Sequence, residues 1–425
     1  MSRFTGIIGI MIILMLAYLW SNNKKRINYR LVITGLLLQF ALAIFVLKVP
    51  IGHKIFAFLG EAINKLLDFS QEGGSFVFGD LTRVSEILPP QIVSTGVFLF
   101  VLLPTIIFVC VLVAMAYHVG LMQRIIALLA RFVHWAMRVS GSEALSNVAS
   151  AFVGQVEAQI MIRPYLAGMT RSELLASMTG SMACIAGGVM AVYISMGVPA
   201  SYLLAASLMA APGALVISKI VFPETEESET KGEIKLDVKK EHANIMDAIS
   251  HGASDGMKIS LNVIAMLIGV IALIALIDAL LGYFGCFLAW TGVSLDAIGL
   301  NVDNLRLKDV VGSLFSLFAV VMGVPAAESM TVGSLLGTKM VINEFVAYSD
   351  LSPMIHQGLL SHKSIIITSF ALCGFANFSS IAIQLGGIGA IAPSRKADLA
   401  KLGFKAMLCG TMASYISACL AGILL

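Results

Sequence analysis

Long uninterrupted apolar runs limit the possible folds of this chain more than any other feature. Four of them cover residues 7–19, 31–47, 97–116 and 261–281, and each is close to the length of a helix that crosses a bilayer. A lipid-facing β-barrel would instead alternate apolar and polar residues with a period of two. Of the 425 residues, 58% are hydrophobic and only 12% are charged, against roughly 25% in soluble proteins. The sequence therefore predicts an all-α polytopic membrane protein.

Charge and cysteine usage exclude several other classes. The net charge of +3 is small and dispersed, and no basic run is interleaved with aromatic residues, so we expect no nucleic-acid partner. The six cysteines form no Cys-x-x-Cys pair and no Cys/His cluster, which argues against a structural metal or a disulfide. His118, His134 and His362 have no suitably spaced carboxylate or cysteine. We therefore expect no enzyme activity and no cofactor.

The distribution of basic residues predicts the orientation of the chain. Basic loops prefer the cytoplasm, and a cluster at 24–30 directly follows the first apolar run, which predicts an N-terminus outside the cell. A second cluster, at 395–405, lies between the last two apolar segments, which predicts a C-terminus that is also outside. Two amphipathic stretches, at about 52–69 and around Arg124, Arg131 and Arg138, are too polar to span and predict interfacial helices.

Two glutamates interrupt strongly apolar segments. Glu157 lies in 145–162 and Glu344 lies in 323–350. A carboxylate at bilayer depth costs roughly 2.5–3.5 kcal/mol on insertion scales, so it usually marks a pathway or a binding site. Each segment is broken by polar or glycine residues near its centre, and half of one, about nine residues, covers only about half of a 30 Å hydrocarbon core. The pattern predicts two re-entrant helical hairpins.

The same order of elements occurs twice. Each hairpin is followed by a helix broken near its middle, at 184–188 and at 373–380, and then by an intact helix. Three spans precede the first hairpin and six precede the second, so the hairpins enter the membrane from opposite sides. Inverted repeats with broken helices are the architecture in which secondary transporters bind substrate at the midplane.

These patterns predict five regions. Residues 1–138 hold helices one to three with interfacial helices, 139–222 the first repeat, 223–258 a cytoplasmic loop, 259–320 helix six with an interfacial helix, and 321–425 the second repeat. Asp278, near the end of helix six, is expected to snorkel to the interface. Glu344 has a structural alternative, an ion pair with Lys339 one turn earlier.

Eight strings along the chain resemble the concentrative nucleoside transporters. They occur in the order expected for that family and cover nearly the whole chain. The strings are Gly154-Gln155-Val156-Glu157, Arg163-Pro164-Tyr165-Leu166, Ile185-Ala186-Gly187-Gly188, Phe222-Pro223-Glu224-Thr225-Glu226, Gly323-Val324-Pro325, Asn343-Glu344-Phe345-Val346-Ala347, Cys373-Gly374-Phe375-Ala376-Asn377-Phe378-Ser379-Ser380 and Ala392-Pro393-Ser394-Arg395-Lys396.

The resemblance implies a cation-coupled nucleoside importer of the bacterial inner membrane, with eight spans, two opposed hairpins and a homotrimeric assembly. Helices one, two, three and six would form a scaffold beside which a transport domain moves like an elevator. By the same resemblance, Gln155 and Val156 face the base and Glu157 contacts it through water. Glu344, Asn377 and Ser380 hold ribose hydroxyls, and Phe375 packs beside the nucleoside. Since the family usually has a hydroxyl residue at position 156, the preference between purines and pyrimidines stays open.

The coupling ion is the second open question. The resemblance places it at Ser150, Val153, Cys184 and Ile185, where sodium-coupled members have Asn at the first position and Ser at the third. Sodium favours oxygen ligands, which a thiol does not supply. Serine at position 150 resembles a proton-coupled branch, whereas the flanking strings resemble the sodium branch. Sodium is favoured and proton coupling is the rival; an uncoupled facilitator or channel is the alternative function.

Overall fold

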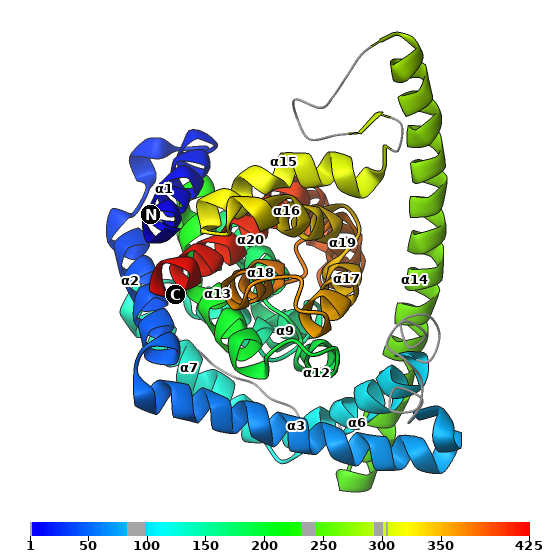
Figure 1. The fold of residues 1–425 in the computed structure, drawn as a ribbon. Helices are drawn as coiled ribbons and strands as arrows, with labels where there is room; N and C mark the ends of the chain where they lie inside the picture. Colours follow the sequence, from blue (N-terminus) through cyan, green and yellow to red (C-terminus); the bar gives the residue numbers. More distant parts are fainter. Residues whose placement is uncertain (1, 83–97, 231–242, 293–300, 303–304) are drawn as a thin grey trace.

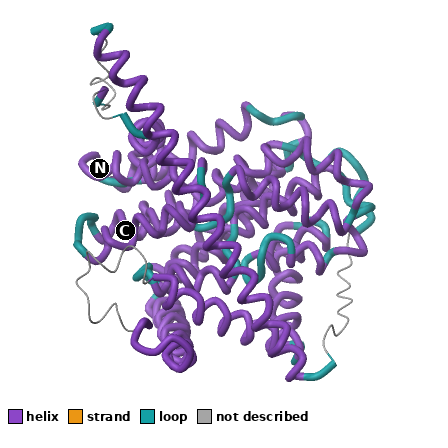
Figure 2. Tube along the Cα trace, turned by 90° about the vertical axis from the view of Figure 1, so that its right-hand side faces the viewer, coloured by secondary structure: helices purple, strands orange, loops and turns teal. Residues whose placement is uncertain are grey.

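The apolar runs form helices throughout the part of the chain that the structure describes. The structure is a computed structural model, and it describes all residues except 1, 83–97, 231–242, 293–300 and 303–304. Within the described residues every regular element is helical, and short loops join the helices (Figure 2). In chain order the elements are α1 (Ser2–Leu19), η1 (Lys24–Arg26), α2 (Tyr29–Leu47), α3 (Pro50–Phe78), η2 (Gly79–Thr82), α6 (Phe98–His118), α7 (Leu121–Met137), α8 (Gly141–Ser150), α9 (Glu157–Met161), α10 (Arg163–Leu166), α11 (Arg171–Ala183), α12 (Gly187–Ser195), α13 (Ala200–Val221), α14 (Ile245–Trp290), α15 (Leu307–Met322), α16 (Ala326–Val341), α17 (Glu344–His356), α18 (His362–Leu372), α19 (Phe378–Ile391), η5 (Pro393–Arg395) and α20 (Lys396–Leu424).

Five of the described helical segments are long and apolar enough to cross a membrane, and a bent pair makes a sixth. The five are α2, the broken helix α11–α12, α13, the second half of α14, and α20 with its preceding turn. The bent pair is α6 with α7, which meet at 75°. The bend turns α7 away from the axis of α6, and the surface position of α7 stays a prediction. α1 and α19 are shorter apolar helices.

The helices form a central group inside an outer frame (Figure 1). α12, α13 and α16 to α20 gather in the centre, and α1, α2, α3, α6, α14 and α15 lie around them. The second half of α14 has only 6% of its most apolar window buried, whereas the corresponding windows of α13 and α20 are 89% and 78% buried. The frame therefore presents apolar surface outward, while the centre holds the buried part of the chain.

The breaks and hairpins lie where the sequence predicts them. α11 ends at Ala183 and α12 begins at Gly187, while α18 ends at Leu372 and α19 begins at Phe378. α8 and α9 are the arms of hairpin one, and α16 and α17 are the arms of hairpin two. The side chain of Asn343 caps α17 by accepting a hydrogen bond from the Val346 amide, which fixes the helix start at Glu344.

Helix α14 differs from the prediction for its region. It has 46 residues and begins at Ile245, so part of the predicted loop 223–258 is helical, and residues 231–242 lie outside the described residues. The side chain of Asn244 caps this start by accepting from the Asp247 amide. Asp278 accepts a hydrogen bond from the Leu307 amide at 2.8 Å, so its carboxylate supports the start of α15, and its position at the interface stays a prediction. α3 is also longer than the predicted 52–69.

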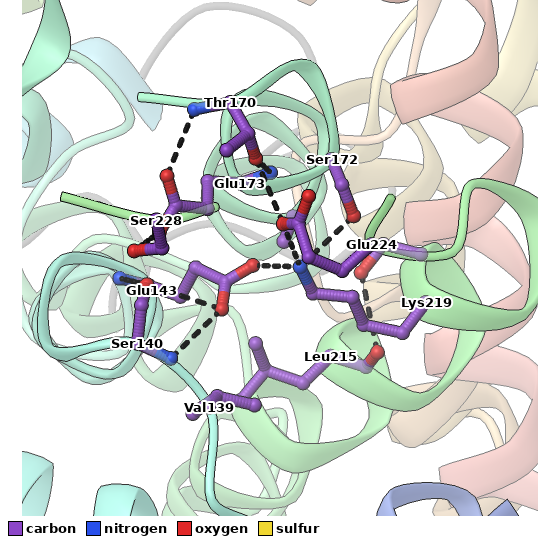
Figure 3. Close-up of polar contacts among 12 residues, drawn as sticks. Val139, Ser140, Glu143, Thr170, Ser172, Glu173, Leu215, Lys219, Glu224 and Ser228 are labelled. Atoms are coloured by element: carbon purple, nitrogen blue, oxygen red, sulfur yellow. Dashed lines mark hydrogen bonds and ion pairs between the residues drawn. The ribbon is translucent and has the colours of Figure 1, made fainter. Parts of the chain in front are cut away.

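A buried charged cluster holds the root of hairpin one (Figure 3). We define the root cluster as Glu143 of α8, Glu173 of α11, Lys219 of α13 and Glu224 of the following loop. The Lys219 ammonium contacts the Glu143 carboxylate, lies 3.2 Å from Glu224 and donates to Ser172 at 2.9 Å. The side chains of Lys219 and Glu143 are 7% and 2% exposed.

Two glutamates of the root cluster also complete helix caps. Glu143 accepts from the Ser140 amide at 3.1 Å, and Glu173 accepts from the Thr170 amide at 2.8 Å, so each closes a capping box. Glu173 accepts a further hydrogen bond from Ser228 in the loop after α13. Three helix ends are thereby joined to one buried ammonium.

The root of hairpin two is held differently. Glu328 of α16 accepts from the Ser361 amide and hydroxyl, at 3.2 and 3.0 Å, and the contact is exposed. Ser361 caps α18 as Thr170 caps α11. The two repeats therefore share the carboxylate-to-cap contact, but only repeat one adds a buried lysine to it.

Candidate functional site

The two broken helices touch where their backbones unwind. Gly374 has a φ of +112°, and the carbonyl oxygen of Ala183 occupies the space that a side chain at position 374 would need. Glycine is required here because it has no Cβ and adopts positive φ without steric cost. The unwound residues 373–377 of repeat two therefore lie directly against the end of α11 in repeat one.

Glu344 lies at the tip of hairpin two and is 5% exposed. One carboxylate oxygen, Oε2, accepts from Asn377 Nδ2 at 2.9 Å, and the other, Oε1, accepts from the Tyr193 hydroxyl at 3.0 Å. Tyr193 stacks on Tyr348, with ring centroids 4.2 Å apart. The predicted alternative, an ion pair between Glu344 and Lys339, is wrong for these two described residues, because the Lys339 ammonium bonds to backbone carbonyls instead.

Asn377 extends the contact toward hairpin one. Its Oδ1 accepts from the Ser380 amide at 2.9 Å and caps α19. The Ser380 hydroxyl lies 3.4 Å from Gln155 Nε2, at the tip of hairpin one, and Gln155 Oε1 lies 3.4 Å from Gln384 Nε2. A continuous polar chain, which we name the midline chain, thus runs through Glu344, Asn377, Ser380 and Gln155, and links the two hairpin tips.

Three other predicted residues border this chain without entering it. Glu157 begins α9 and its side chain is exposed; the carboxylate lies over Gly154, in the space that a side chain there would fill. Val156 is half-buried and packs against Gly387 of α19. Phe375 is half-buried in the break between α18 and α19. The structure thus brings Gln155, Glu344, Asn377 and Ser380 together. The other three predicted residues lie within two positions of Gln155 or Asn377 along the chain.

The residues predicted to hold the coupling ion lie between hairpin one and α11. The Ser150 hydroxyl, at the end of α8, donates to the Ser146 carbonyl at 2.7 Å and lies 2.9 Å from the Ser181 hydroxyl. The Cys184 thiol points to the Ser207 carbonyl at 3.6 Å, which directs it toward α13. Val153 and Ile185 are both buried.

Gln159 is the least expected member of this region. It is fully buried, and its amide nitrogen lies 2.7 Å from the Ser181 hydroxyl and 3.1 Å from that of Ser146, while its oxygen accepts from Ser177 at 2.6 Å. The second arm of hairpin one is thereby joined to its first arm and to α11 through hydroxyl groups.

Comparison with known proteins identifies the family. Residues 202–422 of this chain match the family model of the Na⁺ dependent nucleoside transporter C-terminus, and residues 8–81 match the model of its N-terminus. Residues 99–200 match a nucleoside recognition model. An uncharacterized transporter of Bacillus subtilis, YutK, is 42% identical over the full length of both chains. The nucleoside permease NupC of Helicobacter pylori is 35% identical over 99% of this chain and 98% of its own. This chain belongs to the concentrative nucleoside transporter family.

Relatives from mammals and solved structures agree with this assignment. The mouse sodium/nucleoside cotransporter 2 is 39% identical over 98% of this chain, which spans 62% of the mouse protein. The transporter CNTnw in an inward-facing, substrate-bound state is 38% identical, with a TM-score of 0.89 over 100% of this chain and 98% of that one. A variant of CNTnw in an outward-facing state gives a TM-score of 0.90. The predicted polytopic helical transporter fold is confirmed.

Sequence reasoning missed several polar residues of this concentrative nucleoside transporter. Tyr193 and Gln384 contact predicted residues, yet each lies inside an apolar helix, where a tyrosine or a lone glutamine resembles ordinary packing. Gln159 follows Gln155 by four residues, a spacing that places both on one helical face if the chain stays helical. The break in hairpin one instead puts them in different contacts.

Proposed function

We propose that this chain is a sodium-coupled nucleoside importer that moves its substrate by an elevator motion of the central helices. The observation that carries the proposal is the midline chain, which joins the tips of two opposed hairpins through buried carboxylate, amide and hydroxyl groups. Buried polar groups are costly unless they are satisfied, and a hydroxyl-rich substrate can satisfy these in turn. The set suits a neutral sugar-linked base.

Each residue of the midline chain has a role in this proposal. The Glu344 carboxylate accepts from a ribose hydroxyl, and Asn377 and Ser380 complete the contacts to the sugar. Gln155 faces the base, because its two contacts at 3.4 Å lie beyond the usual range for strong bonds and are readily exchanged for those of a ligand.

The bordering residues complete the proposed pocket. Val156 offers the base an apolar surface, Glu157 reaches it through water, and Phe375 supplies an aromatic face on which the nucleoside packs.

Sodium is the proposed coupling cation, held by Ser150, Val153, Cys184 and Ile185. Cys184 and Ile185 follow the end of α11, where the last carbonyls of a half-helix carry partial negative charge, and such ends coordinate cations in broken-helix transporters. The cysteine contributes its backbone carbonyl in this arrangement, since its thiol points to Ser207. The similarity to the mouse sodium/nucleoside cotransporters 1 and 2 supports sodium over the proton.

The elevator motion and a homotrimeric assembly rest on the outer frame. Large apolar side chains project from α14 with more than half of their surface exposed, among them Leu280, Phe284 and Phe287. In a bilayer this surface faces lipid or neighbouring protomers, while the central helices move beside it. We propose a multi-pass location in the bacterial inner membrane, with both termini outside.

Uptake of radiolabelled uridine and adenosine into proteoliposomes tests the function. We expect accumulation that stops when sodium is replaced by choline, and little change between two external pH values at constant sodium. Glu344→Gln and Asn377→Ala should each abolish uptake in protein that elutes as the wild type does. Accumulation driven by a pH gradient without sodium would assign the coupling to protons. Equilibration without accumulation would instead support the facilitator.

A further inference from the structure

Lys339 is a fully buried lysine whose ammonium bonds only to backbone in the described residues. It is 1% exposed, lies two residues before the end of α16, and donates to the carbonyl oxygens of Ala371 at 2.9 Å and Cys373 at 3.2 Å. Those carbonyls are at the end of α18, where the helix breaks. Ser414 of α20 donates to the Cys373 carbonyl as well, at 2.7 Å.

The carbonyls at this position are a natural place for a positive charge. The last carbonyls of a helix have no intrahelical partner and carry about half a negative elementary charge in sum. A helix that ends inside a protein at membrane depth cannot satisfy them with bulk water. The lysine supplies both the donors and the charge, so it holds the end of α18 in place.

In the described residues, no charged side chain bonds to the carbonyls at the corresponding half-helix end of repeat one, the end of α11. There the end of hairpin one's first arm also packs at the end of a half-helix, but the contact is between the hydroxyls of Ser150 and Ser181, 2.9 Å apart. Near the end of α11 the contact to the hairpin is thus a pair of hydroxyls, whereas near the end of α18 it is an ammonium on carbonyls. The two repeats therefore differ in the group that contacts the end of the half-helix, which is neutral at α11 and positively charged at α18.

We infer that Lys339 is a positioning residue for nucleoside binding: its ammonium is a tethered cation that does in repeat two what a free coupling cation does in repeat one. The inference rests on the proposed function. The lysine fixes Cys373, and the next residues along the unwound segment are Gly374, Phe375, Ala376 and Asn377. Removal of the charge therefore releases the side of the pocket that carries Asn377.

Nucleoside binding and sodium-driven uptake by Lys339→Met test the inference. Methionine keeps the length and apolar stem but removes the charge and the donors. We expect the KM for uridine to rise at least tenfold, with a smaller change in maximal rate, because the pocket still closes once it is filled. In Lys339→Ala, ethylammonium should restore part of the lost affinity by occupying the vacated place.

Two further variants separate positioning from a merely structural role. Lys339→Arg keeps the charge and should bind uridine more tightly than Lys339→Met. Lys219→Met removes another buried lysine of the described residues, the one in the root cluster. This variant should be less stable than the wild type but should have the wild-type KM for uridine, and ethylammonium should not change that KM.

The possible results are distinct. A wild-type KM in Lys339→Met, a Lys339→Arg variant no better than Lys339→Met, or a Lys339→Ala variant indifferent to ethylammonium would each overturn the inference. Wild-type protein that takes up no nucleoside would refute the proposed function instead, so the two failures are told apart in the same vesicles. If Lys339→Met does not fold, the comparison of Lys339→Arg with the wild type and the ethylammonium response of Lys339→Ala still decide the question.

Discussion

Loss of Lys219 should destabilise the protein far more than its single charge suggests. The ammonium pairs with Glu143, whose side chain is 2% exposed, and also contacts Glu224 and Ser172. Lys219→Met leaves the Glu143 carboxylate buried without its partner, and removal of one partner of a buried pair costs about 3–5 kcal/mol. We expect a loss of that size in the free energy of unfolding.

A double-mutant cycle in detergent measures this effect. Lys219→Met combined with Glu143→Gln removes both charges, and neutral replacement of a buried pair is often close to neutral in stability. The double variant should therefore recover most of what the single variant loses, and comparison with Glu143→Gln alone should give a coupling energy of about 2–3 kcal/mol.

Hairpin two provides the matched control. Glu328 makes the equivalent cap contact to Ser361, but the contact is exposed, so Glu328→Gln should cost less than about 1 kcal/mol. Two results would refute the view that the root cluster stabilises the fold through its buried ion pair. One is a loss below about 1 kcal/mol in the free energy of unfolding of Lys219→Met, and the other is a double variant no more stable than that single variant.

Three more substitutions give clear expectations. Gly374→Ala places a Cβ against the Ala183 carbonyl at a backbone φ of +112°, so uptake should fall more than tenfold while the circular dichroism spectrum stays helical. Normal uptake would show that the backbone can move enough to accommodate the methyl group. Val156→Thr replaces a methyl group by a hydroxyl of similar size beside the proposed base site, so the ratio of uridine to adenosine uptake should change severalfold at unchanged sodium dependence. An unchanged ratio would show that Val156 does not contact the base. Ser150→Ala removes one proposed ligand, so the half-saturating sodium concentration should rise severalfold with the same uridine KM at saturating sodium; an unaltered sodium response would place the ion elsewhere.

Much of the fold was predictable because a bilayer allows few solutions. Backbone groups in lipid must be satisfied within a helix, so each apolar run predicts a helix, and each glycine- or amide-rich interruption predicts a break that faces a cavity. The breaks at 184–186 and 373–377 follow this rule. The length of α14 was not predictable in the same way: residues 245–258, about four turns, carry several charged and polar side chains that are typical of a loop, and the Asn244 cap that starts the helix is seen only in the structure.

The candidate site was predictable in its members more than in its contacts. Glu344, Asn377 and Gln155 stand out as polar residues in apolar segments, but the sequence cannot show which of them meet across repeats. Lys339 demonstrates the limit: one turn from Glu344 it suggests an ion pair, and only the three-dimensional path of α18 reveals carbonyls that compete for the ammonium. Local spacing predicts candidates, whereas long-range packing selects partners.

The crossing of Gly374 over Ala183 has a consequence for how such chains diverge. The contact joins the backbone of repeat two to the backbone of repeat one, so neither repeat forms it alone. Because position 183 presents its carbonyl oxygen, its side chain can change without disturbing the contact, whereas any side chain at position 374 would strike that oxygen. We expect glycine at position 374 in homologues that keep this crossing, whatever residue stands at position 183.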